Sequence, residues 1–146
     1  MYTMQKKAKA TTTNDRIPEV VVKFQTCPFL ASTGVLGKKW TLLILWVIAL
    51  LRVKRFNQIR RSIPGLTSRV LVIRLHELEK SGHIEALIVK ESPRVVEWTL
   101  TDKGTDTIPI LMSIMKFTIK WYPEEVFGDN KSHTMNELFP ETEYPR

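Results

Sequence analysis

Seven basic residues between positions 52 and 76 are the most concentrated source of chemistry in this sequence. They are Arg52, Lys54, Arg55, Arg60, Arg61, Arg69 and Arg74. No acidic residue lies among them. Clustered ammonium and guanidinium groups bind polyanions, above all the phosphates of nucleic acids. A solvated basic surface explains most charge runs on their own, so the local pattern around these cations decides between the two interpretations.

The same stretch predicts two short helices joined by a tight turn. Each helix has one apolar face, formed by Phe56, Ile59 and Ile63 in the first and by Leu71, Leu75 and Leu78 in the second. Pro64-Gly65 ends the first helix, Thr67 is a suitable N-cap for the second, and Ser81-Gly82 ends the second. Two such helices with an outward basic face are typical of a helix-turn-helix, here over about residues 55–81.

The outward face of the second helix carries the side chains that we expect to meet DNA bases. These are Ser68, Arg69, Val72, Ile73 and His76. Arg69 can hydrogen-bond guanine or a phosphate, whereas Val72 and Ile73 offer only apolar contacts, for example to thymine methyl groups. The alternative for Val72 and Ile73 is that both pack within the protein.

A second group of residues is expected to contact the DNA phosphates, either from the first helix and its approach or from a β-wing. We expect such contacts from Lys54, Arg55, Arg60, Arg61, Thr67, Lys90 and Arg94. Arg74 lies near the leucine stripe, so pairing with Glu77 is as plausible for it as contact with DNA.

The flanking segments predict the elements that hold this unit. Residues 29–36 form a short first helix with Pro28 in its first turn, and a second helix starts at Gly37 and runs to about Leu51. Because this second helix is apolar on all sides, we expect it at the centre of the domain or at a subunit interface. Two strands, residues 84–90 and 95–100, joined by residues 91–94, predict the wing over 84–100.

A last long helix is expected over residues 101–122, capped by Thr101 and kinked near Pro109. One of its apolar faces comprises Ile108, Leu111, Met112, Met115, Ile119 and Tyr122. The other, nearly opposite, comprises Ile110, Ile114, Phe117 and Trp121. A small domain can bury only one face, so the second predicts a homodimer interface with the same helix of another subunit. The alternative is a more enveloping monomer.

Length and charge narrow the class of protein. The 146 residues, 43% apolar and 25% charged, favour one domain with a real core. The net charge of +7 is uneven, because residues 27–122 carry +8 and residues 123–146 carry −4. A basic globular part with an acidic tail again favours a nucleic-acid partner.

Other classes of function find little support. One cysteine allows no internal disulfide and fits a cytoplasmic location, and no signal peptide opens the chain. The longest apolar run, from Leu42 to Leu51, is too short to cross a bilayer, so we expect no membrane role. His76, His83, His133 and Cys27 lack zinc-site spacing, and no phosphate loop or nucleophile–base pair is evident. We therefore expect no metal, no cofactor and no enzymatic activity.

The ordered set of motifs resembles the HxlR family of winged helix-turn-helix transcriptional regulators, within the MarR-like superfamily. The resemblance covers about residues 27–122 and is carried by Cys27-Pro28, residues 37–45, Arg55-Phe56-Asn57, Pro64-Gly65, residues 69–71, Arg74-Leu75, residues 77–79, Gly82, residues 96–104 and Pro109. It implies an α+β, mostly helical fold: a winged helix-turn-helix with a two-stranded β-wing and a C-terminal dimerisation helix. Outside it lie a flexible basic arm, residues 1–26 with a short extended segment, and the acidic tail, residues 123–146, whose Leu138-Phe139 is suited to docking.

The resemblance also bears on two details. Similar regulators often have polar residues where Val72 and Ile73 stand, so this departure suggests A·T-biased or weakly discriminating readout. Several similar regulators have an oxidant-sensing cysteine at the position of Cys27, and thiols at helix N-termini tend to be reactive. The alternative is that Cys27 is a small buried apolar residue. Because the chain has no second cysteine, an oxidised Cys27 cannot form a disulfide within its own subunit, and an intersubunit Cys27–Cys27 bond remains open.

These observations together predict a homodimeric, sequence-specific regulator that binds an inverted repeat in double-stranded DNA and responds to redox state or a small ligand. Two alternatives remain open. The first is a sequence-tolerant architectural DNA binder, and the second is a winged-helix module that binds proteins instead of DNA.

Overall fold

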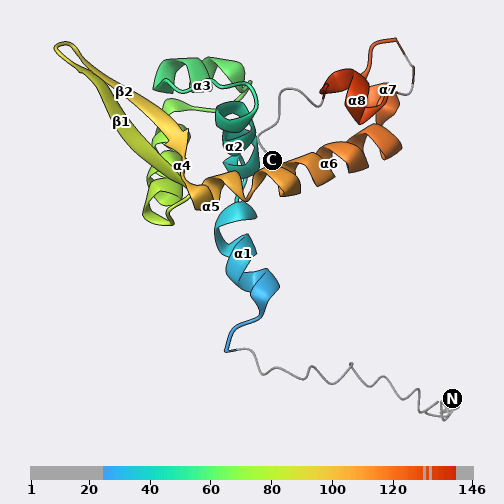
Figure 1. Cartoon of the computed structure of the whole chain (residues 1–146), viewed down its shortest axis with the longest axis horizontal. Coiled ribbons are helices and arrows are strands. Elements are labelled where there is room, and N and C mark those ends of the chain that lie inside the picture. Colours follow the sequence, from blue (N-terminus) through green and yellow to red (C-terminus); the bar gives the residue numbers. More distant parts are fainter. Residues whose placement is uncertain (1–24, 130, 132, 141–146) are drawn as a thin grey trace, which may run out of the picture.

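The computed structural model describes residues 25–129, 131 and 133–140, so the expected basic arm and extended segment before residue 25 lie outside the described residues. The elements are α1 Pro28–Leu36, α2 Thr41–Ala49, α3 Phe56–Ser62, α4 Ser68–Lys80, β1 Ile84–Glu91, β2 Arg94–Leu100, α5 Asp102–Thr105, α6 Ile108–Trp121, α7 Pro123–Val126 and α8 Met135–Leu138. In Figure 1, α1, the β1–β2 hairpin and α6 extend in different directions from a body formed by α2, α3 and α4.

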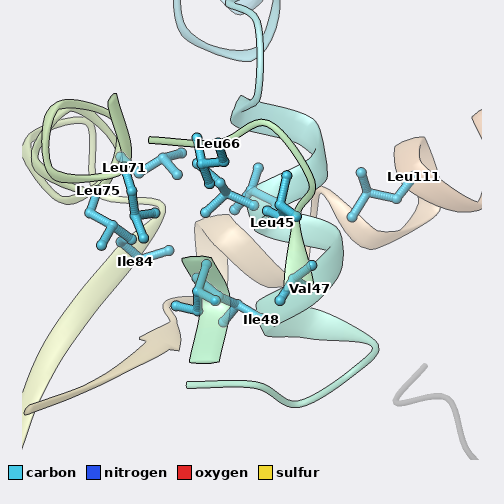
Figure 2. Close-up of a cluster of buried hydrophobic side chains, with 12 residues drawn as sticks. Leu45, Val47, Ile48, Leu66, Leu71, Leu75, Ile84 and Leu111 are labelled. Atoms are coloured by element: carbon cyan, nitrogen blue, oxygen red, sulfur yellow. The ribbon is translucent and has the colours of Figure 1, made fainter. Parts of the chain in front are cut away.

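The body is held together by one apolar cluster between α2 and the helix-turn-helix. Its members are Ile44, Leu45, Val47, Ile48, Ile59, Ile63, Leu66, Leu71, Leu75, Leu78, Ile84 and Leu111. Figure 2 shows Leu71 and Leu75 of α4 turned toward Leu45 and Leu66. Since full burial of one such side chain contributes roughly 1.5–3 kcal/mol, this cluster fixes α3 and α4 against α2. The predicted apolar faces of both helices are confirmed, although Phe56 is only half-buried.

Helix α2 is shorter than the sequence suggested. The expected start at Gly37 is wrong, because residues 37–40 form a turn in which Trp40 has a left-handed backbone with φ of 78°. The helix begins at Thr41 and ends at Ala49. It is central, as expected, but not buried on all sides, since Leu43 is exposed.

The wing is a two-stranded antiparallel hairpin with Ile84 opposite Leu100 at its base and Glu91 opposite Arg94 at its tip. Each strand is one residue longer than predicted, because Glu91 belongs to β1 and Arg94 belongs to β2. The register shifts between Ile88 and Lys90. Trp98 and Leu100 pack against the core, and the Trp98 amide donates to the Lys54 carbonyl oxygen over 2.9 Å. The hairpin is therefore anchored at its base.

The single kinked helix expected over residues 101–122 is wrong. Instead, α5 ends at Thr105 and a separate α6 begins at Ile108, with Pro109 in its first turn, where the missing amide hydrogen costs no helical bond. The Thr107 hydroxyl donates to the Gly104 carbonyl oxygen over 2.6 Å between the two helices. Thr101 caps α5 as predicted, accepting from the Gly104 amide over 3.1 Å.

Gly104 is the most closely packed glycine in the described part of the chain. A Cβ atom built on it would fall far inside van der Waals distance of the His83 carbonyl oxygen, which belongs to backbone that cannot swing away. We therefore expect Gly104→Ala to lower the free energy of unfolding by about 3 kcal/mol, measured by urea denaturation.

The matched control for this substitution is Gly34→Ala within α1. A Cβ at Gly34 meets nothing within 4 Å, so this change should raise helix stability by roughly 0.5–1 kcal/mol. Equal effects of the two substitutions on the urea midpoint would contradict the close packing of α5 against His83.

The chain beyond α6 folds back toward α2. Pro123, expected only to end the long helix, begins the short helix α7. The expected docking of the Leu138-Phe139 pair is confirmed for Phe139, whose ring meets Trp46 edge-on at 5.6 Å between centroids. Within the described ranges no single helix is long and apolar enough to cross a membrane, although α1 and α2, bent by 74°, satisfy length and composition as a pair.

Candidate DNA-binding surface

The N-terminus of α4 is organised as the sequence predicted. The Thr67 hydroxyl oxygen accepts a hydrogen bond from the Val70 amide over 3.3 Å, which satisfies one of the free amides of the first turn. Ser68 is the first helical residue and is exposed. This end of α4 therefore presents Ser68 and Arg69 to solvent on a capped, well-defined first turn.

The face of α4 opposite the buried leucines is open. Arg69 and His76 are exposed, and so are two apolar side chains, Val72 at 55% and Ile73 at 44% exposure. The alternative that Val72 and Ile73 pack within the protein is therefore wrong for the isolated chain. All four side chains share one surface, since they lie at i, i+3, i+4 and i+7 on the helix.

The cations around α3 differ in how free they are. Lys54, Arg60 and Arg61 are exposed. Arg55 instead pairs with Glu97 of the wing, with 3.1 Å between its Nε and the Glu97 Oε1. Arg55 therefore ties the start of α3 to β2, and only its remaining donors are free for a phosphate.

The wing tip holds the two predicted cations together with one carboxylate. Lys90 and Arg94 are exposed, and Glu91 lies directly opposite Arg94 in the hairpin. This carboxylate partly offsets the positive potential of the tip, so the wing presents a weaker anion-binding surface than the approach to α3.

Arg74 forms hydrogen bonds with other groups of the protein. Its Nη1 lies 2.7 Å from Glu77 Oε2, and its Nε donates to the Lys39 carbonyl oxygen over 3.0 Å. Lys38 Nζ also contacts Glu77, at 2.7 Å from Oε1. The hydrogen bond from Lys38, and after it Arg74, lowers the pKa of Glu77. Pairing with Glu77 was one of the two predicted alternatives for Arg74, whereas nothing in the local sequence pattern signalled the link to residues 38 and 39.

His83 is the titratable group behind this surface, buried where α4 meets β1. Its Nδ1 lies 2.7 Å from the Ser81 hydroxyl. Burial, and after it the nearby Lys103 ammonium, lowers the pKa of His83 from its ordinary value of 6.5. The folded protein therefore favours the neutral imidazole.

This shift predicts a pH dependence of stability. The stabilisation is fully present above pH 6.5, the unfolded value, and is lost as pH falls toward the lower folded pKa. We expect the urea midpoint to fall between pH 7.5 and pH 5 by more in the wild type than in His83→Gln. The comparison with the variant is needed because Asp129 raises the pKa of His133, which acts in the opposite direction. Parallel pH profiles would contradict the role of His83.

Helix α6 has one covered and one open apolar face. Ile108, Leu111 and Ile119 are buried. Tyr122, assigned to the same face, is exposed, because the helix ends at Trp121. The predicted interface residues Ile110, Ile114, Phe117 and Trp121 are all exposed.

Cys27 lies at the N-cap position of α1 and is exposed. The alternative of a buried apolar Cys27 is therefore wrong for the isolated chain. The same helix exposes Phe29 and Leu30. Among residues 25–129, 131 and 133–140, no group of three or more His, Cys, Asp or Glu side chains is placed to hold a metal ion.

A helix-turn-helix followed directly by an anchored two-stranded hairpin defines this chain as a winged helix-turn-helix protein. It belongs to the HxlR-like helix-turn-helix family, whose model matches residues 35–126. The Bacillus subtilis (strain 168) HTH-type transcriptional regulator YvaP is 38% identical over 98 residues, which cover 66% of this chain and 90% of YvaP. The resemblance deduced from the motifs is confirmed, and the protein is a transcriptional regulator of this type.

Solved structures give the same result. A regulator assigned to the MarR family from Porphyromonas gingivalis W83 matches with a TM-score of 0.61 and 33% identity over 68% of this chain and 97% of that one. The redox regulator HypR in its oxidised form matches with a TM-score of 0.58 and 31% identity, covering 63% of this chain and 94% of HypR. The α+β winged-helix fold is therefore confirmed.

Proposed function

We propose that this regulator binds an inverted-repeat operator as a homodimer and reads its bases with the N-terminal half of α4. The observation that carries the proposal is the exposed face of Arg69, Val72, Ile73 and His76 on a helix whose opposite face is fully buried. A side chain can enter the major groove only from such a face. Ser68 and Arg69 supply polar contacts there, and Val72 and Ile73 supply apolar contacts to thymine methyl groups.

Phosphate contacts would position this helix. The exposed cations Lys54, Arg60 and Arg61 lie on α3 and its approach, beside the reading helix. Lys90 and Arg94 of the wing, the free donors of Arg55 and the Thr67 hydroxyl complete the set. These contacts hold orientation and carry no sequence information themselves.

The open face of α6 supports the homodimer. Ile110, Ile114, Phe117 and Trp121 form an apolar strip that no described part of the chain covers. An isologous pairing of two such strips places the two reading helices on one side of the DNA. Their separation would be one helical turn, roughly 34–36 Å, so the operator is an inverted repeat.

Two signals are compatible with the described residues. Cys27 is exposed at the start of α1, and the similar protein HypR is a redox regulator. A small apolar molecule is the other candidate, since Leu42, Leu43, Trp46, Leu111, Ile114 and Met115 line a groove of about 270 Å³ between α2 and α6.

The redox signal predicts a change in DNA affinity on oxidation. An oxidant such as diamide takes two electrons and two protons from a pair of Cys27 thiols and leaves an intersubunit disulfide. We expect the affinity of the wild type for its operator to change about tenfold, and that of Cys27→Ser to stay constant. Fluorescence anisotropy measures the affinity, and non-reducing electrophoresis detects the cross-link. Equal responses of the two proteins would exclude Cys27 as the sensor.

The function itself is tested by binding the full chain to a pool of random duplexes and comparing the retained fraction with the starting pool. A specific regulator should prefer the retained DNA by about 10³-fold or more. Near-equal affinities would instead indicate an architectural DNA binder, which the exposed Val72 and Ile73 would also suit. Absence of any binding, under reducing and oxidising conditions, would indicate a protein-interaction module.

A further inference from the structure

A polar brace joins the recognition helix α4 to the turn between α1 and α2. Glu77 accepts from Lys38 and from Arg74, both at 2.7 Å, and Arg74 also donates to the Lys39 carbonyl oxygen at 3.0 Å. The brace therefore engages the turn through a side chain at Lys38 and through the backbone at Lys39. We propose that Arg74 and Glu77 are positioning residues that set the rotation of α4 about its own axis, and so decide which side chains face the DNA bases. The proposal rests on DNA readout by α4.

The brace lies where it can resist rotation of α4. At 100° per residue, Arg74 and Glu77 lie on one flank of α4, between the buried leucines and the exposed reading face. The other flank of α4 faces a hollow and makes no hydrogen bond to a neighbouring element within the described residues. This hollow is lined by Val72, His76 and Glu79 of α4 together with Phe56 and Trp98. The leucines hold the helix down, but apolar contacts are non-directional and constrain its rotation less than hydrogen bonds do.

No other α4 side chain is hydrogen-bonded to a different element in the described part of the chain. The guanidinium of Arg74 is suited to this role because it is planar and donates to two acceptors in fixed directions. The turn also contacts the helix-turn-helix directly, because Trp40 has a left-handed backbone and the edge of its ring lies within van der Waals reach of a Cβ built on Gly65. The brace therefore joins α4 to a turn that itself packs against the helix-turn-helix.

Rotation of α4 has a recognisable effect on binding. It moves Arg69, Val72, Ile73 and His76 together relative to the base edges, whereas the phosphate contacts from Lys54, Arg60 and Arg61 stay in place. Loss of the brace should therefore lower affinity for the operator and leave affinity for unrelated DNA, with its salt dependence, nearly unchanged.

The primary test compares Glu77→Ala with Glu79→Ala. Both remove one carboxylate from α4, but Glu79 forms no ion pair within the described residues. The probes are a duplex selected from a random pool by the wild type and a scrambled duplex of equal length and composition. We expect Glu77→Ala to lower the ratio of the two affinities by about tenfold and Glu79→Ala to keep it within about twofold.

Two further variants separate positioning from charge and from folding. Arg74→Lys keeps the charge but cannot reach both acceptors, so it should lower the ratio as Glu77→Ala does. Lys38→Met should lower the ratio, whereas Lys39→Met should not, because only the backbone carbonyl of Lys39 takes part. Thermal denaturation identifies any variant that loses the fold. If Glu77→Ala is such a variant, the affinity ratios of Arg74→Lys and Lys38→Met decide the test in its place.

The outcomes are distinguishable. A wild type that discriminates between the two duplexes, together with brace variants that discriminate equally well, would overturn the positioning role alone. Equal losses of affinity for both duplexes would also overturn it, because that pattern belongs to a phosphate contact or a weakened fold. A wild type that selects no sequence would overturn the proposed DNA readout, and the positioning role with it.

Discussion

Replacing Ile114 and Phe117 with glutamate should convert the protein to a monomer and lower its affinity for a duplex with two half-sites by about 100-fold. Both side chains lie on the open strip of α6, with 44% and 55% of their surfaces exposed in the isolated subunit. The substitutions should therefore leave the subunit folded. In a paired strip, however, four carboxylates would be buried without partners, which strongly disfavours association.

Lys116→Glu is the matched control for this double variant. It lies on the same helix, is exposed away from the strip, and changes the net charge by the same two units. Sedimentation equilibrium should give a monomer for the double variant and a dimer for the control and the wild type. A double variant that remains a dimer would show that the subunits associate through another surface.

Replacing Lys54, Arg60 and Arg61 together with glutamine should weaken DNA binding on the order of 100-fold at moderate salt. Each phosphate contact releases about 0.9 counterions from the DNA. Loss of three contacts should therefore make the slope of log affinity against log salt less steep by roughly 2–3 per subunit. The loss should be similar for operator and unrelated DNA, because phosphate contacts do not read sequence.

The control is a second triple variant that loses the same charge from α6 and the segment after it. In this variant glutamine replaces Lys116, Lys120 and Lys131. The control should keep the wild-type salt slope. Equal slopes for the two triple variants would mean that the basic residues near α3 do not contact phosphates. Retained regulatory activity after neutralisation would favour the protein-interaction alternative.

The helix-turn-helix was predictable because its signals are local. The spacing of Leu71, Leu75 and Leu78 marks a buried helix face, Pro64-Gly65 breaks the chain, and Thr67 caps the next helix; the structure has each of these features. The wing was also predictable from its two β-prone runs, apart from one extra residue at the end of each strand nearest the turn.

Element boundaries that depend on tertiary contacts were not predictable in the same way. Helix α2 starts at Thr41 because Trp40 is held in a left-handed conformation, which no periodic pattern signals for a bulky residue. The break between α5 and α6 follows from the close approach of Gly104 to His83 and from the hydrogen bond between Thr107 and Gly104. The sequence suggested only a kink at Pro109.

The candidate site also has some features that follow from local sequence patterns and others that depend on tertiary contacts. Helical periodicity placed Arg69, Val72, Ile73 and His76 on one face, and the structure leaves that face open. The links from Arg55 to Glu97 and from Lys38 to Glu77 join residues 42 and 39 positions apart, and a single sequence has no local pattern for such pairs. These long-range ion pairs hold α3 to the wing through Arg55 and hold α4 to the turn before α2 through Lys38. Arg60 and Arg61, by contrast, are exposed and form no ion pair within the described residues.

A homodimer that reads a two-fold symmetric operator through α4 should select DNA of matching symmetry. This selection is measured by sequencing the duplexes that the full chain retains from a random pool at two salt concentrations. We expect an inverted repeat whose half-site centres lie one helical turn apart, about 10 base pairs, recovered at both salt concentrations. Retained DNA without a shared repeat, bound only at low salt, would contradict symmetric readout by a homodimer.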